Sequence, residues 1–255
     1  MNRAAIAPAF VALLSAMPWA APLSAQDPWQ WDIEAGGSLF FGEVDQTTLT
    51  AGAAVEKADS AYELSARIGF DYGETRDAQS GSAVVSRRSW LAGVSFDWAP
   101  EGRWSEFLFG TGERSFEKRI DFRYNGGIGL KHTFVSDERS RIDLSGAVLA
   151  EQTFPQNRTE SSPTSDLLAR LSVRLRFRHT FGDDRLSFDT RNLYGPKLGD
   201  ASNYTVRSVN SLDYSLTSVV AVGVNLDYDY DSLSIDRGAR SNRTGKVYLT
   251  LKATF

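Results

Sequence analysis

The last ten residues of this chain alternate between polar and apolar side chains and end on an aromatic residue. Successive side chains of a β-strand point to opposite faces, so an alternating stretch builds one apolar and one polar face. The apolar face would carry Val247, Leu249, Leu251, Ala253 and Phe255. The opposite face would carry lysine and threonine side chains. Such a strand suits a wall that meets hydrocarbon on one side and water on the other.

The same two-residue period returns between Trp31 and Phe255, and turn-forming residues separate the segments. Most segments have about ten residues, the length that a tilted transmembrane strand requires. The pattern predicts an all-β fold, a transmembrane antiparallel up-and-down β-barrel of about 12 strands over residues 26–255. An even strand number would leave both termini on one side. A soluble β-sandwich also alternates, but it explains neither the aromatic positions nor the loop lengths described below.

The N-terminus has the composition of a cleaved export signal. Arg3 precedes an apolar stretch over residues 4–21, and small residues stand at Ser24 and Ala25. Two prolines interrupt this stretch, which is also shorter than the ~20 apolar residues of a spanning helix. We therefore predict a signal peptide over residues 1–25 and a final location in the bacterial outer membrane.

Composition narrows the possible classes of function. The chain has 28 basic and 32 acidic residues and a formal net charge of -4, so we expect no nucleic-acid binding. The lack of cysteine excludes disulfide scaffolds and thiolate metal sites. The mean hydropathy of -0.30 is usual for a soluble protein. It is also compatible with a barrel, in which only alternate residues face lipid.

The predicted connections alternate in length. Short turns are predicted near residues 57–60, 99–103, 135–140, 182–184 and 217–218. Longer loops are predicted near residues 73–82, 112–118, 153–165, 195–203 and 232–244. The link at 43–47 is the exception, a short loop on the side of the long ones. Short turns of such barrels face the periplasm and long loops face the exterior.

Aromatic residues fall at the predicted strand ends, where the two membrane interfaces would lie. The short-turn end has Trp31, Trp98, Trp104, Phe134, Phe181 and Phe255. The long-loop end has Tyr72, Tyr194, Tyr204, Tyr228 and Tyr230. We expect outer-membrane lipids and lipopolysaccharide around the barrel, and the outer-membrane assembly machinery as the partner of the C-terminal strand.

Three pieces of the sequence carry a family resemblance: residues 42–49 (GEVDQTTL), 123–131 (RYNGGIGLK) and 249–255 (LTLKATF). They resemble the YdiY-like, salt-induced outer-membrane proteins, a family with a domain of unknown function, and the resemblance covers roughly residues 41–255. The family commonly has asparagine where this chain has Glu43. The resemblance implies an outer-membrane barrel of uncharacterised role, and it carries over no catalytic or ligand residue.

Charged residues recur on the predicted inward faces of the strands. A basic ladder comprises Arg170, Arg174, Arg176, Arg178, Arg191 and Arg207. An acidic ladder comprises Asp213, Asp227, Asp229 and Asp231. The two ladders could face each other across the lumen and orient a polar solute, as charged rings do in pores. Alternatively, inward charges pair with neighbours such as Asp143, Glu151 and Asp189 and plug the lumen. A barrel of ~12 strands is intermediate in size, so both possibilities stay open.

Catalysis and metal binding find little support in the sequence. Hydrolases of this membrane use a histidine beside a serine or an aspartate, and the chain has only His132 and His179, both near the short-turn end. Two histidines are too few for an open zinc site. A calcium ion shared by Asp227, Asp229 and Asp231 is disfavoured because alternate strand positions lie too far apart. We expect no enzyme activity, no cofactor and no metal.

The sequence therefore favours a narrow pore, or an envelope-maintenance barrel, for small polar solutes, with the two ladders as its selectivity elements. One alternative is a barrel enzyme that hydrolyses lipids or peptides. Another is a structural or adhesive surface protein that acts through the loops at 153–165 and 232–244. The solute and the oligomeric state stay open.

Overall fold

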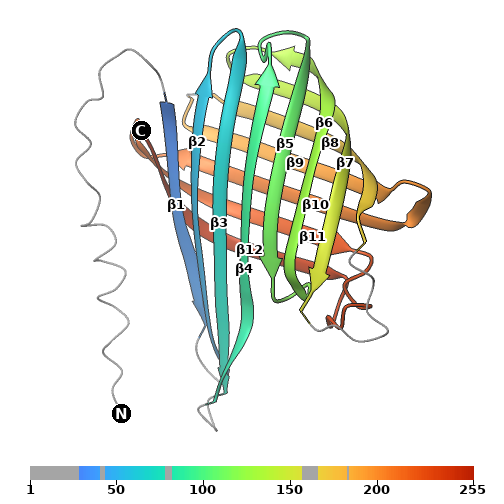
Figure 1. The fold of residues 1–255 in the computed structure, drawn as a ribbon. Helices are drawn as coiled ribbons and strands as arrows, with labels where there is room; N and C mark the ends of the chain where they lie inside the picture. The colour runs from blue at the N-terminus through green and yellow to red at the C-terminus, as the bar shows by residue number, and fades with distance from the viewer. Residues whose placement is uncertain (1–28, 41–43, 78–81, 157–165, 183) are drawn as a thin grey trace.

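A computed structural model describes residues 29–40, 44–77, 82–156, 166–182 and 184–255. The predicted signal peptide lies outside these residues. Within them, no helix is long and apolar enough to cross a membrane. Twelve strands are present (Figure 1): β1 (Trp29–Phe40), β2 (Val44–Ala58), β3 (Tyr62–Asp77), β4 (Ala83–Trp98), β5 (Trp104–Ser115), β6 (Ile120–Ser136), β7 (Ser140–Pro155), β8 (Leu168–Phe181), β9 (Leu186–Lys197), β10 (Asp200–Ser215), β11 (Val220–Asp231) and β12 (Arg243–Thr254).

The strands form one closed antiparallel barrel, which confirms the predicted fold class and strand number. Each strand pairs with its neighbours in sequence, and β1 pairs with β12 through a register that joins Asp32 to Thr254. Beyond that pair, the N–H of Phe255 donates to the carbonyl oxygen of Trp31 at 2.9 Å. Closure leaves no strand edge exposed, which a wall in hydrocarbon requires because lipid offers no hydrogen bonds.

Burial in this barrel is the reverse of that in a soluble protein. Apolar side chains at alternate positions point outward and are exposed, as for Val247 at 68% and Ile128 at 63%. Polar side chains point inward and are buried, as for Arg170 and Asn225, each at 3%. The outer surface is therefore suited to lipid and the inner surface to water or to other polar groups.

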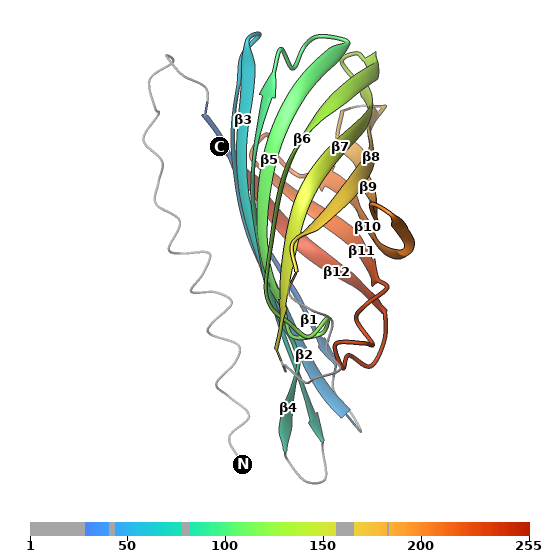
Figure 2. The same ribbon diagram turned by 45° about the vertical axis from the view of Figure 1, so that its right-hand side comes forward.

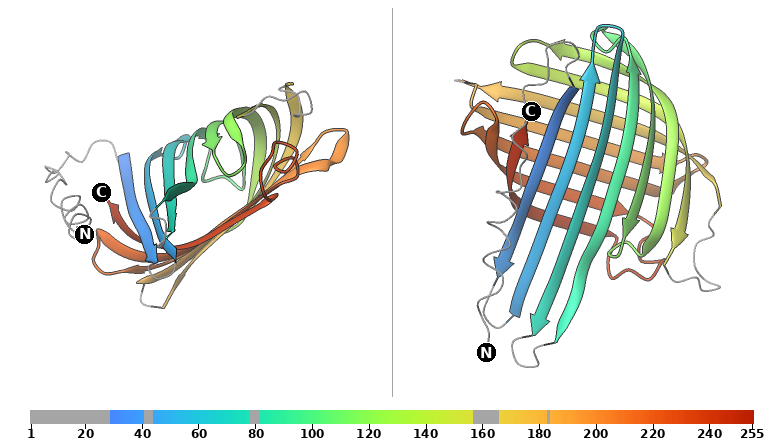
Figure 3. Two further views of the ribbon diagram at one scale, coloured as in Figure 1. Left: turned by 90° about the horizontal axis from the view of Figure 1, so that it is seen from below. Right: turned by 60° about the vertical axis from the view of Figure 1, so that its left-hand side comes forward.

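The barrel is flattened rather than round. Strands β1–β7 form one wall and β8–β12 form the opposite wall, and the two sets of strands run in clearly different directions (Figures 1 and 3). Both described ends of the chain lie at one end of the barrel, which we call the terminal end. The opposite end, which carries the connection at 232–242, is called the far end (Figure 2).

The loop lengths differ from the prediction at the far end. The predicted long loops at 73–82, 112–118 and 195–203 shrink to connections at 78–82, 116–119 and 198–199, because the flanking strands continue their ladders beyond the apolar segments. The turn at 198–199 is possible because Gly199 adopts a positive φ of 80°. Only the connections at 156–167 and 232–242 are long, and residues 157–165 lie outside the described part.

The aromatic residues at the predicted strand ends all lie on the outward side. Trp31, Trp98, Trp104, Phe134, Phe181 and Phe255 are exposed at the terminal end. At the far end, the Tyr204 ring lies 5.8 Å from Tyr194 and 5.0 Å from Tyr230 between ring centroids. Tyr72 and Tyr228 lie on the same outward rows. Two bands of aromatic side chains thus bracket the apolar surface, as at two membrane interfaces.

A ring of four polar side chains interrupts the apolar surface on β9 and β10. By register, Thr190, Asn192, Ser208 and Asn210 share the outward face with Phe177 and Leu226. Thr190 Oγ1 donates to Asn210 Oδ1 at 2.7 Å, and Ser208 Oγ donates to Asn192 Oδ1 at 2.7 Å. The amide nitrogens of Asn192 and Asn210 donate back to Thr190 and Ser208 at 2.9 and 3.0 Å. The ring satisfies most of its own polar groups.

Breaking this ring is expected to cost more than removing it. The substitution Thr190→Val leaves both asparagine side chains with a lost partner facing hydrocarbon, which should lower the free energy of unfolding by about 1–3 kcal/mol. Replacing all four side chains by apolar ones (Thr190→Val, Asn192→Leu, Ser208→Ala, Asn210→Leu) should cost less or stabilise the barrel. Urea unfolding in vesicles measures both. A quadruple variant less stable than the single one would contradict this account.

Candidate functional site

The lumen collects the charged side chains of both predicted ladders. Arg170, Arg174, Arg176 and Arg178 occupy alternate positions of β8 and share the inward face with Arg191 of β9, which pairs with Arg176. Arg207 lies inward on β10, and its ladder partner on β11 is Asp229. Asp213, Asp227 and Asp231 occupy the same inward rows of β10 and β11. The alternation alone accounts for this placement.

The two ladders do not face each other as a pair, contrary to one of the two sequence hypotheses. The acidic residues are neutralised by cations on adjacent strands or connections instead. Asp213 pairs with Lys252 at 2.8 Å, and Asp227 pairs with Lys246 at 3.3 Å. Asp229 forms an ion pair with Lys118 at 3.3 Å. Among the residues of the basic ladder, Asp229 contacts only Arg207, at 3.8 Å. Lys246, Lys252 and Lys118 lie nearer to the acidic ladder than most of the basic ladder does, because they belong to a neighbouring strand or to a turn at the same end of the barrel.

A compensated set of charges fills the far end of the lumen, and we call it the far-end cluster. It comprises Lys118, Arg123, Arg170, Arg207, Arg237 and Lys246 with Asp71, Glu113, Glu151, Asp227, Asp229 and Asp231. Six positive and six negative groups give no net charge. Pairing of this kind is expected where side chains are buried, because an unpaired charge there costs several kcal/mol.

Arg123 lies at the centre of the far-end cluster. Its guanidinium donates to Asp231 at 2.7 Å, to Glu113 at 3.0 Å and to the hydroxyl of Thr153 at 2.8 Å. Burial alone would lower the pKa of the nearby Lys118 ammonium in the turn at 116–119, but Asp229 and Glu113 raise this pKa above its ordinary value. Both cations therefore stay charged and hold the acidic residues in place.

The connection at 232–242 folds into the far mouth of the barrel. Arg237 is buried and donates from its guanidinium to Asp231 at 2.6 Å and to the carbonyl oxygen of Lys118 at 3.2 Å. Ser234 is also buried, and a positive φ of 88° at Gly238 turns the chain back. One alternative from the sequence was an adhesive surface protein that acts through the loop at 232–244. Among the described residues, it instead narrows the mouth.

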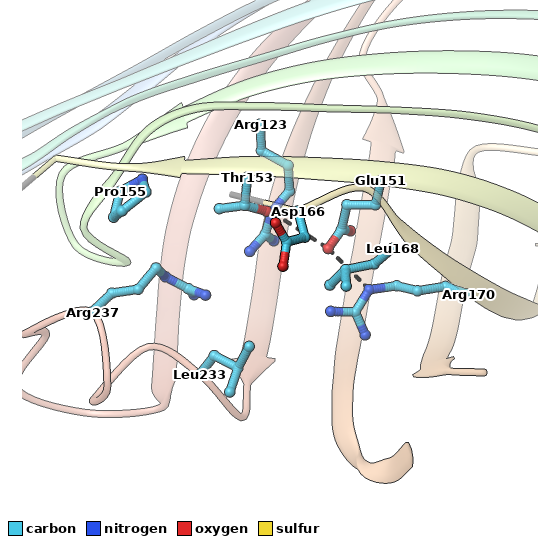
Figure 4. A pocket seen from close by; sticks show the side chains of 9 residues that line it. All are labelled: Arg123, Glu151, Thr153, Pro155, Asp166, Leu168, Arg170, Leu233 and Arg237. Atoms are coloured by element: carbon cyan, nitrogen blue, oxygen red, sulfur yellow. Dashed lines mark hydrogen bonds and ion pairs between the residues drawn. The ribbon is translucent and has the colours of Figure 1, made fainter. Parts of the chain in front are cut away.

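A small cavity remains beside this connection. Arg123, Glu151, Arg170, Leu233 and Arg237 are among its lining residues (Figure 4). About 20 Å³ of it can hold the centre of a water molecule, which is room for roughly one water. The far mouth is thus tightly filled where the structure describes it.

The middle and terminal half of the lumen is more open. Arg178 and Arg191 point inward, yet their side chains are 51% and 46% exposed. An inward side chain can be exposed only if water enters the lumen. We call Arg67, Arg174, Arg176, Arg178 and Arg191, together with Asp189, the lumenal arginine cluster. Asp189 accepts hydrogen bonds from Arg176, Arg178 and Arg191 at 3.3, 3.1 and 2.8 Å.

Several residues of these clusters were missed as site residues. They are Arg67, Asp71, Glu113, Lys118, Arg123, Arg237 and Lys246. Asp189 and Glu151 were expected only as partners that plug the lumen. Their strand phase did place Arg67 and Arg123 inward, but Arg123 and Asp231 are separated by 108 residues in sequence. No local signal predicts that they touch.

The two histidines lie on the outer wall rather than in the lumen. His132 packs between Trp104 and Phe134, with ring centroids 4.4 and 4.6 Å apart. His179 Nδ1 lies 2.9 Å from the hydroxyl of Ser140, a pair that the sequence did not predict. Within the described part of the chain, no group of three acidic or histidine side chains could hold a metal ion.

The chain was compared with known families, curated proteins and solved structures. A family model described as "Protein of unknown function, DUF481" matches residues 33–247. No curated protein matches the chain. Among solved structures, the chain is similar to the NanC porin, with 12% identity, coverage of 88% of this chain and 97% of that one, and a TM-score of 0.45. It is also similar to an outer membrane channel from Pseudomonas putida F1, with 9% identity, coverage of 91% of this chain and 96% of that one, and a TM-score of 0.47. A third similar structure is the KdgM porin, with 9% identity, coverage of 89% of this chain and 98% of that one, and a TM-score of 0.39. Such likeness concerns the fold alone.

The far-end cluster generates a stability prediction. The substitution Asp231→Asn removes the carboxylate that Arg123 and Arg237 share, so it should lower the free energy of unfolding by about 3–5 kcal/mol. Asp236→Asn makes the same chemical change at an exposed position of the adjoining connection at 232–242 and should have almost no effect. Denaturant unfolding in detergent compares the two. Equal stabilities would show that the buried network does not hold the mouth.

Proposed function

We propose that this chain, which belongs to the DUF481 family, is a narrow channel of the bacterial outer membrane for small polar solutes. The terminal end would face the periplasm and the far end the exterior, as in barrels whose termini lie inside. Lipids and lipopolysaccharide would surround the outer wall, and the outer-membrane assembly machinery would engage the C-terminal strand. The chain resembles the YdiY-like, salt-induced outer-membrane proteins, and induction by salt would fit a role in maintaining the envelope.

The observation that carries this proposal is the unequal filling of the lumen. Arg178 and Arg191 point inward and are 51% and 46% exposed, so water can reach them from the terminal end. The far-end cluster and the connection at 232–242 then narrow the remaining path. Charges that water can reach inside a barrel are the means by which a channel selects solutes.

The narrowing also suggests why the solute would be small. Arg237 closes the path through hydrogen bonds to Asp231 and to the main chain of Lys118. These bonds link the connection at 232–242 to β11 and to the β5–β6 turn. A side chain that holds a segment in the mouth acts as a constriction, and its removal should widen the path.

Planar-bilayer recording tests the channel. The purified protein should give discrete conductance steps, and Arg237→Ser should raise the unitary conductance about twofold or more because the constriction loses its anchor. Arg240→Ser is the matched control, since Arg240 is exposed in the same connection. It should leave the conductance unchanged. Silent bilayers with both the parent protein and Arg237→Ser would remove the proposal.

A hydrolase is the second candidate, and one contact favours it. Ser140 and His179 form a hydrogen-bonded pair on the outer wall, where lipid would be within reach. The described residues provide no hydrogen-bonded carboxylate for the other ring nitrogen of His179, so the triad arrangement is incomplete. We therefore propose that the protein is not an enzyme. Loss of lipid or peptide hydrolysis on Ser140→Ala would reverse this choice.

A further inference from the structure

We propose that the lumenal arginine cluster is a binding site for an oxyanion, a carboxylate, phosphate or sulfate group carried by the solute. The inference deepens the proposed channel function, because it names the solute class. The binding site itself does not depend on conduction, so the two can fail separately. Its support comes from charge balance, from unused hydrogen-bond donors and from open space.

The charge of the cluster is unbalanced. Asp189 is the carboxylate that Arg176, Arg178 and Arg191 share, at N–O distances of 3.3, 3.1 and 2.8 Å. Arg67 and Arg174 add two further positive charges, so five arginines and one aspartate carry a net charge of +4. The far-end cluster, by contrast, has as many acidic as basic groups. The imbalance is therefore a local property of the middle of the lumen.

Several guanidinium donors in the cluster are unused. In the described part of the structure, no hydrogen bond or ion pair joins Arg67 to another side chain. Arg174 donates to the hydroxyl of Ser172 at 3.1 Å and stacks over the Phe109 ring at 4.0 Å, without an acidic partner. The Nε atom of Arg176 is buried and has no partner. Buried donors normally find acceptors, so this Nε atom points to an absent acceptor. Arg67 is exposed and Arg174 is half-buried, so both present free donors to the water of the lumen.

The cluster spans the lumen. Arg67 belongs to β3 in one wall, whereas Arg174, Arg176 and Arg191 belong to β8 and β9 in the other. The charges of these three arginines, and that of Arg207, bear on the Arg67 guanidinium through space. Because like charges repel, the folded barrel holds them together only at a cost. An anion between the walls would offset that cost.

Space for such an anion lies beside Arg67. Gly69 is the next inward position on β3, and a methyl group built on it would meet no atom within 4 Å. The neighbouring acidic residues are engaged elsewhere, since Asp97 bonds Lys131 and Asp143 bonds Arg141 at 2.8 Å. Glu34, Glu56 and Glu63 line β1–β3. An anionic solute would therefore bind at the arginines and avoid this carboxylate row.

The chemistry of guanidinium selects the ligand class. Its planar fork of N–H donors matches the paired oxygens of carboxylate, phosphate and sulfate, whereas chloride offers no such pair. A site with several such forks should bind an oxyanion more tightly than chloride at equal ionic strength. The substrate class is accordingly an acid-bearing small solute, one whose charged group contacts Arg67, Arg174, Arg176 and Arg191.

Titration calorimetry of the full-length processed protein in lipid-free detergent, with inorganic phosphate against a chloride background, tests the site. Phosphate should bind, and the double variant Arg67→Gln/Arg174→Gln should weaken its binding about tenfold or more through two lost charge-assisted contacts. Arg139→Gln, at an exposed turn outside the lumen, should bind like the parent protein. Equal binding by the parent and the double variant, or no binding by the parent, overturns the inference.

Two further readouts separate the possible failures. Arg67→Gln alone should raise the unfolding temperature in phosphate-free buffer, because it relieves repulsion between the arginines. A lower unfolding temperature would mean that Arg67 has a structural partner, and it would count against the site. In bilayers, the parent should favour anions and the double variant should lose that preference. Phosphate binding without conductance would leave the site standing and remove the channel. Conductance without phosphate binding or anion preference would leave the channel standing and remove the oxyanion site.

Discussion

Hydrogen bonding of the main chain in hydrocarbon is the constraint on which this structure depends. Lipid offers neither donors nor acceptors, so every strand must pair on both sides. The pairing of β1 with β12 completes the circle, and the reciprocal bonds between Trp31 and Phe255, at 3.0 and 2.9 Å, extend it to the end of the chain. Once the wall is closed, alternate side chains are committed to the interior whatever their charge.

The interior resolves its charges in two different ways. At the far end, little water enters, so each cation of the cluster meets an acidic partner, as Arg123 meets Asp231 and Glu113. In the middle, exposed side chains such as Arg191 show that water is present, and water screens repulsion between like charges. An uncompensated cluster can persist there. An anionic solute would find space there and would be attracted by the net positive charge of the arginines.

Much of the fold was predictable because the outward or inward direction of a side chain depends only on whether its position is odd or even within a strand. That is why Arg174 and Arg176 were placed in the lumen from sequence. The loop lengths were wrong at the far end because apolar alternation ends where lipid ends, whereas strand pairing continues. The polar ring around Asn192 and Asn210 was missed because its hydrogen bonds join two strands.

The sequence by itself determined that the chain forms a closed β-barrel, how many strands it has, and which side chains line its lumen. These properties follow from a two-residue period that every strand repeats. Only the tertiary structure decided which charges meet. The contact of Arg237 with Asp231 depends on the inward fold of one connection. The position of Arg67 on the wall opposite to Arg191 depends on the flattening of the barrel (Figure 3). Both depend on how the chain packs in three dimensions, which the alternation of side chains along a strand does not specify.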